Sequence, residues 1–401
     1  MKFEEEIIDG VYLHPNVVFS VWVYTVVGFV FLFVGFILAH IVYGKQIKIK
    51  QNQVLSSHYP VSINRYDTSN SNFKWVLSLL LLSVAVLLFY RQQIGEFPLE
   101  SIFRGLSGAD LALLRSDATN NFSGKYYRYA IFMEILPLFL FILVAIIRNP
   151  QMSRKWNVLF VLLIIYNIFY SIISLQKAPL VNFLILCYLI YSYRKRKMEK
   201  KPLLIVGSIV VVLVILMYVF FMGRAESPVS DILGGALHRI FISSIIPFFW
   251  YIMYTNKYGL LYGTSFPNPG GIFPFEHFRL PVEVMNYARR YDSDVVGTMP
   301  TIFIGEMYSN FGIVGIIVSA VLVGFILQAI DILFWKRMNN SKGVLLSTIF
   351  IYLIIHCYHY TISGVSGVLF DTNLYTILFL ALWYYKRTRN FDKKHLLKQY
   401  E

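Results

Sequence analysis

The sequence predicts an all-α, polytopic transmembrane bundle of about 9–11 spans. Three observations predict it: the composition, the apolar runs and the placement of charge. Of the 401 residues, 57% are hydrophobic and only 14% are charged. A soluble domain carries about 25% charged residues to cover its surface. Much of this chain's surface must therefore face lipid, and we expect one integral membrane domain over residues 1–401.

Nine apolar runs have the composition of membrane-spanning helices. They cover residues 17–43, 73–90, 129–147, 157–175, 178–193, 203–222, 311–335, 344–361 and 371–385. A further apolar patch, Ile240 to Tyr254, is interpreted as an interfacial or re-entrant helix, which a membrane tolerates when it is buried in protein. A full crossing there would invert the orientation of everything that follows, and the span count depends on this patch.

Basic residues follow the apolar runs directly, which is the positive-inside pattern. The clusters are Lys45, Lys48 and Lys50; Arg148, Arg154 and Lys155; Arg194 to Lys197; Lys336 and Arg337; and Lys386, Arg387 and Arg389. They predict an outer N-terminus, a cytoplasmic C-terminus and two large outer loops, 91–128 and 223–300. The formal net charge of +14 is thereby explained without a nucleic-acid partner.

Soluble-enzyme motifs are absent from the sequence. There is no phosphate-cradling GxxxxGK[ST], no GxGxxG after a strand, no HExxH and no Cys/His cluster. The pair Asp292 and Asp294 resembles a metal site for nucleotide sugars, but the outer loop that carries it is not supplied with them. We therefore expect neither a metal nor a cofactor.

Arginines in the outer loops are the candidates for binding an anionic substrate. A guanidinium binds phosphate oxygens in a bidentate way and stays charged in any environment. Arg239 stands at the mouth of an apolar helix, where an unpaired charge is costly, and Arg289 lies later in the same loop. Arg224 and Arg279 are lesser candidates, and snorkelling also explains Arg224.

The segment 297–315 is the most informative part of the chain. Glu306 stands about one helical turn before the lipid-embedded run, with Tyr308 and Asn310 beside it as candidate substrate contacts. A carboxylate at such a boundary is either a structural partner for an outer-loop arginine or a general base. Both roles stay open for Glu306 on the sequence alone.

Other ionisable residues lie within the predicted spans. His356 and His359 share a helix face, where helix–helix hydrogen bonding is the simplest role and a proton relay or metal site the alternative. Glu134 lies three residues before Pro137 in the run 129–147. An ionisable group at that depth is a functional candidate by default.

The stretch Pro300 to Gly312 resembles the Gly-Glu-x-Tyr-x-Asn-Phe-Gly segment of bacterial Wzy-class polysaccharide repeat-unit polymerases (O-antigen or capsule polymerases). Here that segment reads Gly-Glu-Met-Tyr-Ser-Asn-Phe-Gly over residues 305–312. Residue-level similarity is confined to about 290–325, whereas the topology is similar over most of the chain. The resemblance implies a GT-C-like bundle in the bacterial cytoplasmic membrane with a long extracytoplasmic loop.

The resemblance also implies glycosyl transfer at the outer membrane leaflet. A growing glycan moves from an undecaprenyl-pyrophosphate carrier onto a lipid-linked repeat unit, and a chain-length regulator protein is the implied partner. Arginines stabilise the pyrophosphate leaving group, and we expect Arg239 and Arg289 to do so. Glu306 is the expected base for the acceptor hydroxyl, with His238 in reserve.

Three rival functions have different requirements. A lipid-linked oligosaccharide flippase or other transporter needs a polar pathway at midplane depth, whereas the polar residues here collect in one outer loop. An O-antigen ligase shares the chemistry but uses another acceptor. A membrane-bound acyltransferase is disfavoured because no suitably placed His-Asp or His-Asn signature is evident.

Overall fold

The computed structural model describes most of the chain, and its regular structure is helical apart from one hairpin. It describes residues 6–8, 11–13, 15–44, 67–102, 110, 113–114, 117–119, 122, 126–148, 152–173, 177–195, 198–221, 234, 245–268, 271–289, 297–337 and 343–400. The hairpin pairs β1 (Glu6–Ile8) with β2 (Val11–Leu13) antiparallel. The helical architecture predicted from the sequence is therefore confirmed in its coarse form.

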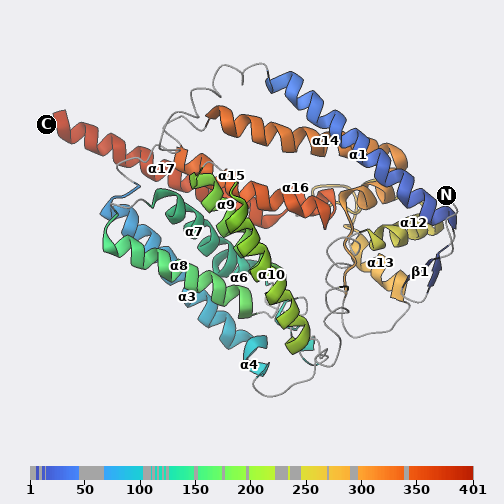
Figure 1. Cartoon of the computed structure of the whole chain (residues 1–401), viewed down its shortest axis with the longest axis horizontal. Coiled ribbons are helices and arrows are strands. Elements are labelled where there is room, and N and C mark those ends of the chain that lie inside the picture. Colours follow the sequence, from blue (N-terminus) through green and yellow to red (C-terminus); the bar gives the residue numbers. More distant parts are fainter. Residues whose placement is uncertain are drawn as a thin grey trace. The chain divides into compact units, whose positions relative to one another are not determined.

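Each of the nine predicted apolar runs falls on a helix (Figure 1). These helices are α1 (Pro15–Tyr43), α3 (Asn70–Ile94), α6 (Tyr127–Ala130) continuing through η2 (Ile131–Ile135) into α7 (Leu136–Ile147), α8 (Arg154–Ile173), α9 (Lys177–Lys195), α10 (Lys200–Phe221), α14 (Phe303–Arg337), α15 (Gly343–Tyr358) and α17 (Thr372–Tyr400). The shorter helices are α4 (Pro98–Ile102), α12 (Ile246–Tyr258), α13 (Leu280–Arg289), η4 (His359–Thr361) and α16 (Val365–Leu369).

Seven stretches within the described residues are long and apolar enough to cross a membrane. They are Pro15–Tyr43, Asn70–Ile94, Tyr127–Ile147, Arg154–Ile173, Phe303–Leu333, Val344–Thr361 and Val365–Phe391. This confirms a multi-pass helical membrane protein. The other two predicted spans form α9 and α10, and their crossing of the membrane stays a prediction.

The chain forms two compact units. The first, unit 1, consists of Met1–Gln53, Leu233–Lys336 and His356–Asp371. The second, unit 2, consists of Val54–Ile232, Arg337–Ile355 and Thr372–Glu401. Both contain candidate spans, and the single domain expected over residues 1–401 stays a prediction.

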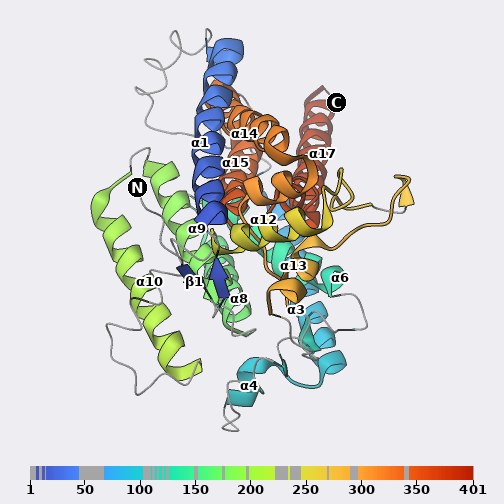
Figure 2. The same cartoon turned by 90° about the vertical axis from the view of Figure 1, so that its right-hand side faces the viewer.

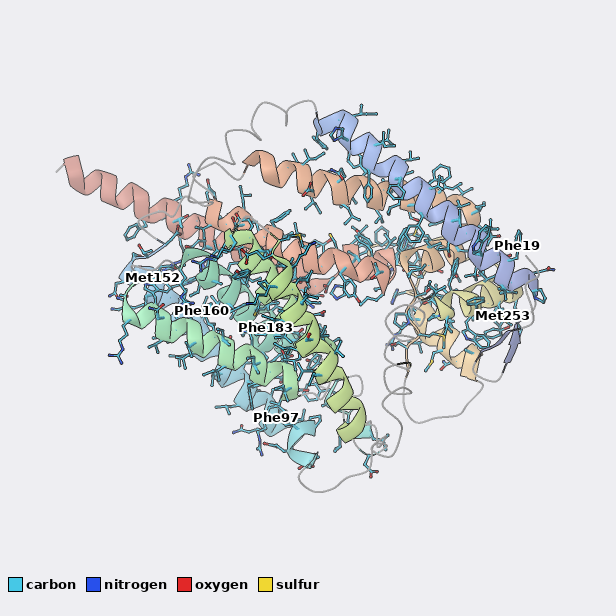
Figure 3. All side chains as sticks on the ribbon, viewed as in Figure 1. Phe19, Phe97, Met152, Phe160, Phe183 and Met253 are labelled. Atoms are coloured by element: carbon cyan, nitrogen blue, oxygen red, sulfur yellow. The ribbon has the colours of Figure 1, made fainter. Side chains whose placement is uncertain are left out.

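Unit 2 is a helical bundle with α7 at its centre. Every residue of α7 except Leu138 is buried, so this helix, which is apolar on all sides, packs against protein around almost its whole circumference. Rings from neighbouring helices close around it: the Phe141 ring lies 5.7 Å from that of Phe160 on α8 and 5.0 Å from that of Phe183 on α9. Figure 3 shows Phe160 and Phe183 between the ribbons of this bundle.

The π-helical turn η2 precedes α7 because of a proline. Pro137 has no backbone N–H, so it cannot donate to the carbonyl four residues earlier, that of Met133. The Tyr166 hydroxyl of α8 donates to this carbonyl at 2.9 Å instead. The irregular turn is therefore stabilised by a hydrogen bond from the neighbouring helix.

Unit 1 is built on a close crossing of α1 and α14, which lie side by side in Figures 1 and 2. A Cβ added to Gly35 of α1 would lie 2.2 Å from the Val321 carbonyl oxygen, and one added to Gly324 of α14 would lie 2.1 Å from that of Leu32. Only glycine permits such an approach of two backbones, as at other membrane helix crossings. The contact holds α14 against α1 at this crossing.

Replacing Gly324 by alanine should weaken this crossing. The new methyl group meets backbone rather than a movable side chain, so the helices must separate, at a cost of roughly 1–3 kcal/mol. Gly207→Ala is the matched control, because a Cβ there meets nothing within 4 Å and alanine favours a helix. Thermal unfolding of the detergent-solubilised protein should show a lower midpoint for Gly324→Ala alone, and equal midpoints would contradict the crossing.

Helix α12 covers most of the apolar patch Ile240 to Tyr254, whose crossing the sequence left open; residues 240–244 of the patch lie outside the described residues. Its 13 residues span about 20 Å at 1.5 Å per residue, less than the roughly 30 Å hydrocarbon core. Figure 2 shows it lying across one end of α1 rather than alongside it. Phe248, Tyr251 and Ile252 are fully or almost fully buried against α1 and its neighbours. This arrangement agrees with an interfacial or re-entrant helix, which stays a prediction.

Candidate functional site

A break in α14 creates the candidate site in unit 1. Gly312 has φ 63° and ψ −149°, a conformation open essentially to glycine alone. The break interrupts the helical hydrogen bonds across it. The carbonyls of Ser309 and Asn310 instead accept from the backbone N–H groups of Leu261 and Tyr262, at 2.9 and 3.0 Å. The segment after α12 is thereby attached to the first turns of α14.

Asn310 fixes this attachment through its side chain, which is fully buried. Its Oδ1 accepts from the Gly263 backbone N–H at 2.9 Å. Its Nδ2 donates to Ser265 Oγ and to the Glu306 carbonyl, both at 2.8 Å. A buried amide that uses both of its ends is a rigid support. The predicted contact of Asn310 with substrate stays a prediction.

The Glu306 carboxylate is 6% exposed and lies where three segments meet. The Ser366 backbone N–H donates to Oε2 at 2.9 Å, and the Ser366 hydroxyl makes a very short hydrogen bond to Oε1. Ser265 Oγ donates to Oε1 at 3.5 Å. A Cβ added to Gly364 would lie 2.1 Å from Oε2. The carboxylate is thus held by neutral donors, which compensate for its burial.

An ion pair between Glu306 and an outer-loop arginine is not found among the residues that the structure describes. Both roles that the sequence left open for Glu306, partner of an arginine and general base, stay predictions. The contacts with neutral donors show a further role: the carboxylate ties residues 364–366 to α14. Tyr251 of α12 stands close by and donates from its hydroxyl to the Met299 carbonyl at 3.1 Å. Burial, with a smaller effect of Glu306, raises the pKa of Tyr251 and keeps its phenol protonated.

The segment that contacts Glu306 is also held at its far end. His356 is 2% exposed; its Nε2 donates to the Val368 carbonyl at 2.8 Å, and its Nδ1 lies 3.4 Å from Asp371 Oδ2. The His356 and His359 rings are 5.7 Å apart, as expected for two histidines on one helix face. His356 therefore positions the connection between α15 and α17, in agreement with the hydrogen-bonding role.

Tyr308 points to a different neighbourhood from Glu306. Its ring lies 4.9 Å from that of Tyr24 on α1 and 6.2 Å from that of Phe248 on α12. The two residues are two positions apart on a helix and so face nearly opposite directions. The structure gives Tyr308 packing contacts with α1 and α12, and its predicted contact with substrate stays a prediction.

The predicted arginines are only partly described. Arg224, His238 and Arg239 lie outside the described residues, and so does the side chain of Arg289, whose backbone ends α13. Arg279 is exposed and immediately precedes α13. The neighbouring Phe278 N–H donates to the Thr264 carbonyl at 2.9 Å. This bond places the backbone next to Arg279 beside that of Thr264, and the predicted role of Arg279 stays a prediction.

Sequence reasoning missed the hydroxyl partners of Glu306. Ser265 lies in an irregular Gly- and Pro-rich segment, and Ser366 lies in the Ser-Gly-Val-Ser-Gly stretch between two apolar runs. Small polar residues between two apolar runs were the signal that the sequence offered. Thr255 of α12 was also missed; its hydroxyl donates to Ser309 Oγ at 2.8 Å.

Glu134 forms a separate polar cluster in unit 2. The Tyr170 hydroxyl donates to its Oε2 at 3.1 Å and lies 2.8 Å from the Tyr126 hydroxyl. Both tyrosines line a small cavity of about 30 Å³, enough for one or two water molecules. Within the described part of the chain, no group of three or more His, Cys, Asp or Glu side chains is placed to hold a metal ion.

Comparisons with known proteins leave the family open: no protein-family model, no curated protein and no solved structure matches this chain.

Proposed function

We propose that this chain is an oligosaccharide repeat-unit polymerase of the outer face of the bacterial cytoplasmic membrane. It would transfer a growing glycan from an undecaprenyl-pyrophosphate carrier onto a lipid-linked repeat unit. The observation that carries the proposal is the meeting of three segments at Glu306: residues 261–265, 306–310 and 364–366. The middle one is the segment that resembles the Wzy-class polymerases.

The charge pattern assigns all three segments to one side of the membrane. With the N-terminus outside and the C-terminus in the cytoplasm, the loop after α12, the start of α14 and the connection between α15 and α17 are extracytoplasmic. Segments far apart in sequence thus form one site on the side where lipid-linked repeat units are joined. The GT-C-like shape and the long extracytoplasmic loop belong to the same proposal.

The depth of the site fits a substrate attached to lipid. The polar run at the start of α14 ends at Asn310, and exposed apolar residues follow at Ile313 and Val314, before the next polar residue, Ser319. Glu306 lies four residues earlier, about 6 Å along a helix axis. It therefore stands just beyond the hydrocarbon boundary, in the headgroup layer. A pyrophosphate linked to a polyprenol, and the sugar bonded to it, would lie at this level.

Glu306 and Ser366 provide a route for the proton that the acceptor hydroxyl loses. Glu306 is too buried to touch a sugar, but Ser366 is half-buried and hydrogen-bonded to it. The acceptor oxygen attacks the anomeric carbon of the donor glycan as the bond to pyrophosphate breaks. Its proton passes to Ser366 Oγ while the serine proton passes to Glu306. The new glycosidic bond and free undecaprenyl pyrophosphate are the products, and no nucleotide or cofactor takes part.

Arginines would stabilise the negative charge on the departing pyrophosphate. We expect Arg239→Ala and Arg289→Ala to lower long-chain polymer by about 100-fold or more at unchanged protein abundance, because removal of one such donor costs 10²–10³-fold. Arg154→Ala is the control, since Arg154 is exposed and assigned to the cytoplasmic side. Glycan electrophoresis and immunoblotting of membranes measure both quantities. Undiminished long-chain polymer in either variant would remove that arginine from the mechanism.

Deletion of the gene, followed by electrophoresis of the surface glycan, tests the proposed function. A polymerase leaves single repeat units attached to the acceptor when it is lost. Loss of a ligase abolishes attachment altogether, and loss of a flippase leaves lipid-linked units on the cytoplasmic side. Either of the last two patterns would replace the proposal by the corresponding rival.

A further inference from the structure

The loop between α12 and α13 exposes an unusual amount of apolar surface. This loop, named here the aromatic loop, runs from residue 259 to 279, of which the structure describes 259–268 and 271–279. Tyr262 and Ile272 are each 76% exposed, Phe273 is 44% exposed and Leu260 is 37% exposed. Such a cluster in contact with water would favour aggregation. We therefore expect these side chains to contact something other than water.

The tip of the aromatic loop has a defined conformation. Asn268 Oδ1 accepts from the Phe273 backbone N–H at 2.9 Å, and its Nδ2 donates to the carbonyls of Phe273 and Phe275 at 3.0 and 2.5 Å. The Phe273 and Phe275 rings stack with centroids 5.6 Å apart. One side-chain amide thus closes the tip and holds Ile272 and Phe273 outward.

Tyr262, at the base of the aromatic loop, has a strained backbone conformation. It has a positive φ of 51°, alone among the described residues other than glycine. The bond from its N–H to the Asn310 carbonyl holds this strained backbone in place. Strain of this kind persists where the surroundings impose it, often at ligand contacts. The ring is 76% exposed, so the described residues of this chain leave it open to a partner.

The hydrogen bonds that attach the aromatic loop to α14 indicate how deep in the membrane the loop lies. Leu261 and Tyr262 bind α14 at Ser309 and Asn310, where the polar part of that helix meets its exposed apolar part. Phe266 packs on Phe311, with ring centroids 6.2 Å apart, so the loop is continuous with the apolar face that α14 presents. Figure 2 shows the loop projecting sideways from α14, across the direction of α1.

We propose that the aromatic loop lies in the interfacial layer of the lipid bilayer and holds the Glu306 site at headgroup depth. Tyrosine, with an apolar ring and a polar hydroxyl, is a typical residue of that layer. Ile272 and Phe273 would reach the first part of the acyl chains. This interaction rests on the membrane depth of α14 and not on glycan transfer, so it can hold if the proposed activity fails.

Nitroxide accessibility in proteoliposomes tests the proposal on the full chain. Single cysteines replace Ile272 and Phe273 in a Cys187→Ala, Cys357→Ala background and carry the spin label. Val318→Cys, on the exposed face of α14, is the lipid control, and Asn286→Cys, exposed on α13, is the aqueous control. Collisions with oxygen relative to a water-soluble nickel chelate should be several-fold more frequent at 272 and 273 than at 286, and should approach those at 318.

Two outcomes would overturn the proposal. Nickel accessibility at 272 and 273 equal to that at 286 means that the loop is in water. Protection from both reagents means that protein covers it. Photo-crosslinking of p-benzoylphenylalanine at Tyr262 in native membranes preserves an aromatic side chain and checks the same point without a cysteine-free background. Phospholipid adducts support the proposal, and protein adducts in their place contradict it.

Discussion

Glu306→Gln should abolish polymer formation while leaving the protein folded. An amide has the shape of the carboxylate, and its oxygen can accept from the Ser366 N–H as Oε2 does now. Its NH2 group would face the hydroxyls of Ser265 and Ser366, which can rotate to accept. The amide cannot take up a proton, so the proposed relay is lost. General-base removal costs about 10²–10⁴-fold in rate, and we expect long-chain glycan to fall by that order.

The measurement pairs glycan electrophoresis with the thermal midpoint of the purified protein. Glu306→Ala is expected to lose both activity and stability, because the donors from Ser265 and Ser366 are then left without their acceptor. Glu276→Gln, an exposed carboxylate of the aromatic loop, is the charge-matched control and should behave as the parent. Normal polymer from Glu306→Gln would show that Glu306 only holds the three segments together.

Gly364→Ala should be the most disruptive single-methyl change in the site. The added Cβ would lie 2.1 Å from Glu306 Oε2 and 2.5 Å from its Cδ. The carboxylate is fixed by its own hydrogen bonds, so the connection 359–371 must move away and release the bond from Ser366. We expect a loss of roughly 1–3 kcal/mol of stability together with loss of polymer.

Gly367→Ala, three residues later, is the matched control for this change. A Cβ there would approach only the Ser363 hydroxyl, at 2.3 Å, and that short side chain can rotate away. Alanine also favours the helix α16 in which Gly367 lies. Thermal unfolding and glycan electrophoresis of the two variants should therefore differ sharply. Equal behaviour would mean that Glu306 is not held against Gly364.

The helices could be predicted from sequence because each span carries its own signal. A run of about 20 apolar residues must satisfy its backbone internally, whatever its neighbours are. The prediction was good for the same reason at α1 and α14. It was less certain at α12, where 13 residues are too few to distinguish a span from a buried helix, and its role depends on contacts with α1 and α13.

The candidate site could be predicted only in part. Glu306 and Asn310 were found because polar residues at the edge of an apolar run are costly there unless they have a purpose. Their partners were not found, since Ser366 is 60 residues away in sequence and a hydroxyl has no pattern of its own. The break at Gly312, the carbonyls that it releases and the loop that they hold all depend on tertiary structure.

Repeat-unit polymerisation is tested most directly with the purified protein in proteoliposomes. An undecaprenyl-pyrophosphate-linked repeat unit is the single substrate. The products are followed by mass spectrometry without nucleotide sugar or metal. We expect lipid-linked dimers and longer glycans, free undecaprenyl pyrophosphate in equal number to the bonds formed, and neither product with Glu306→Gln. Movement of the intact lipid across the bilayer without any new glycosidic bond would contradict this expectation.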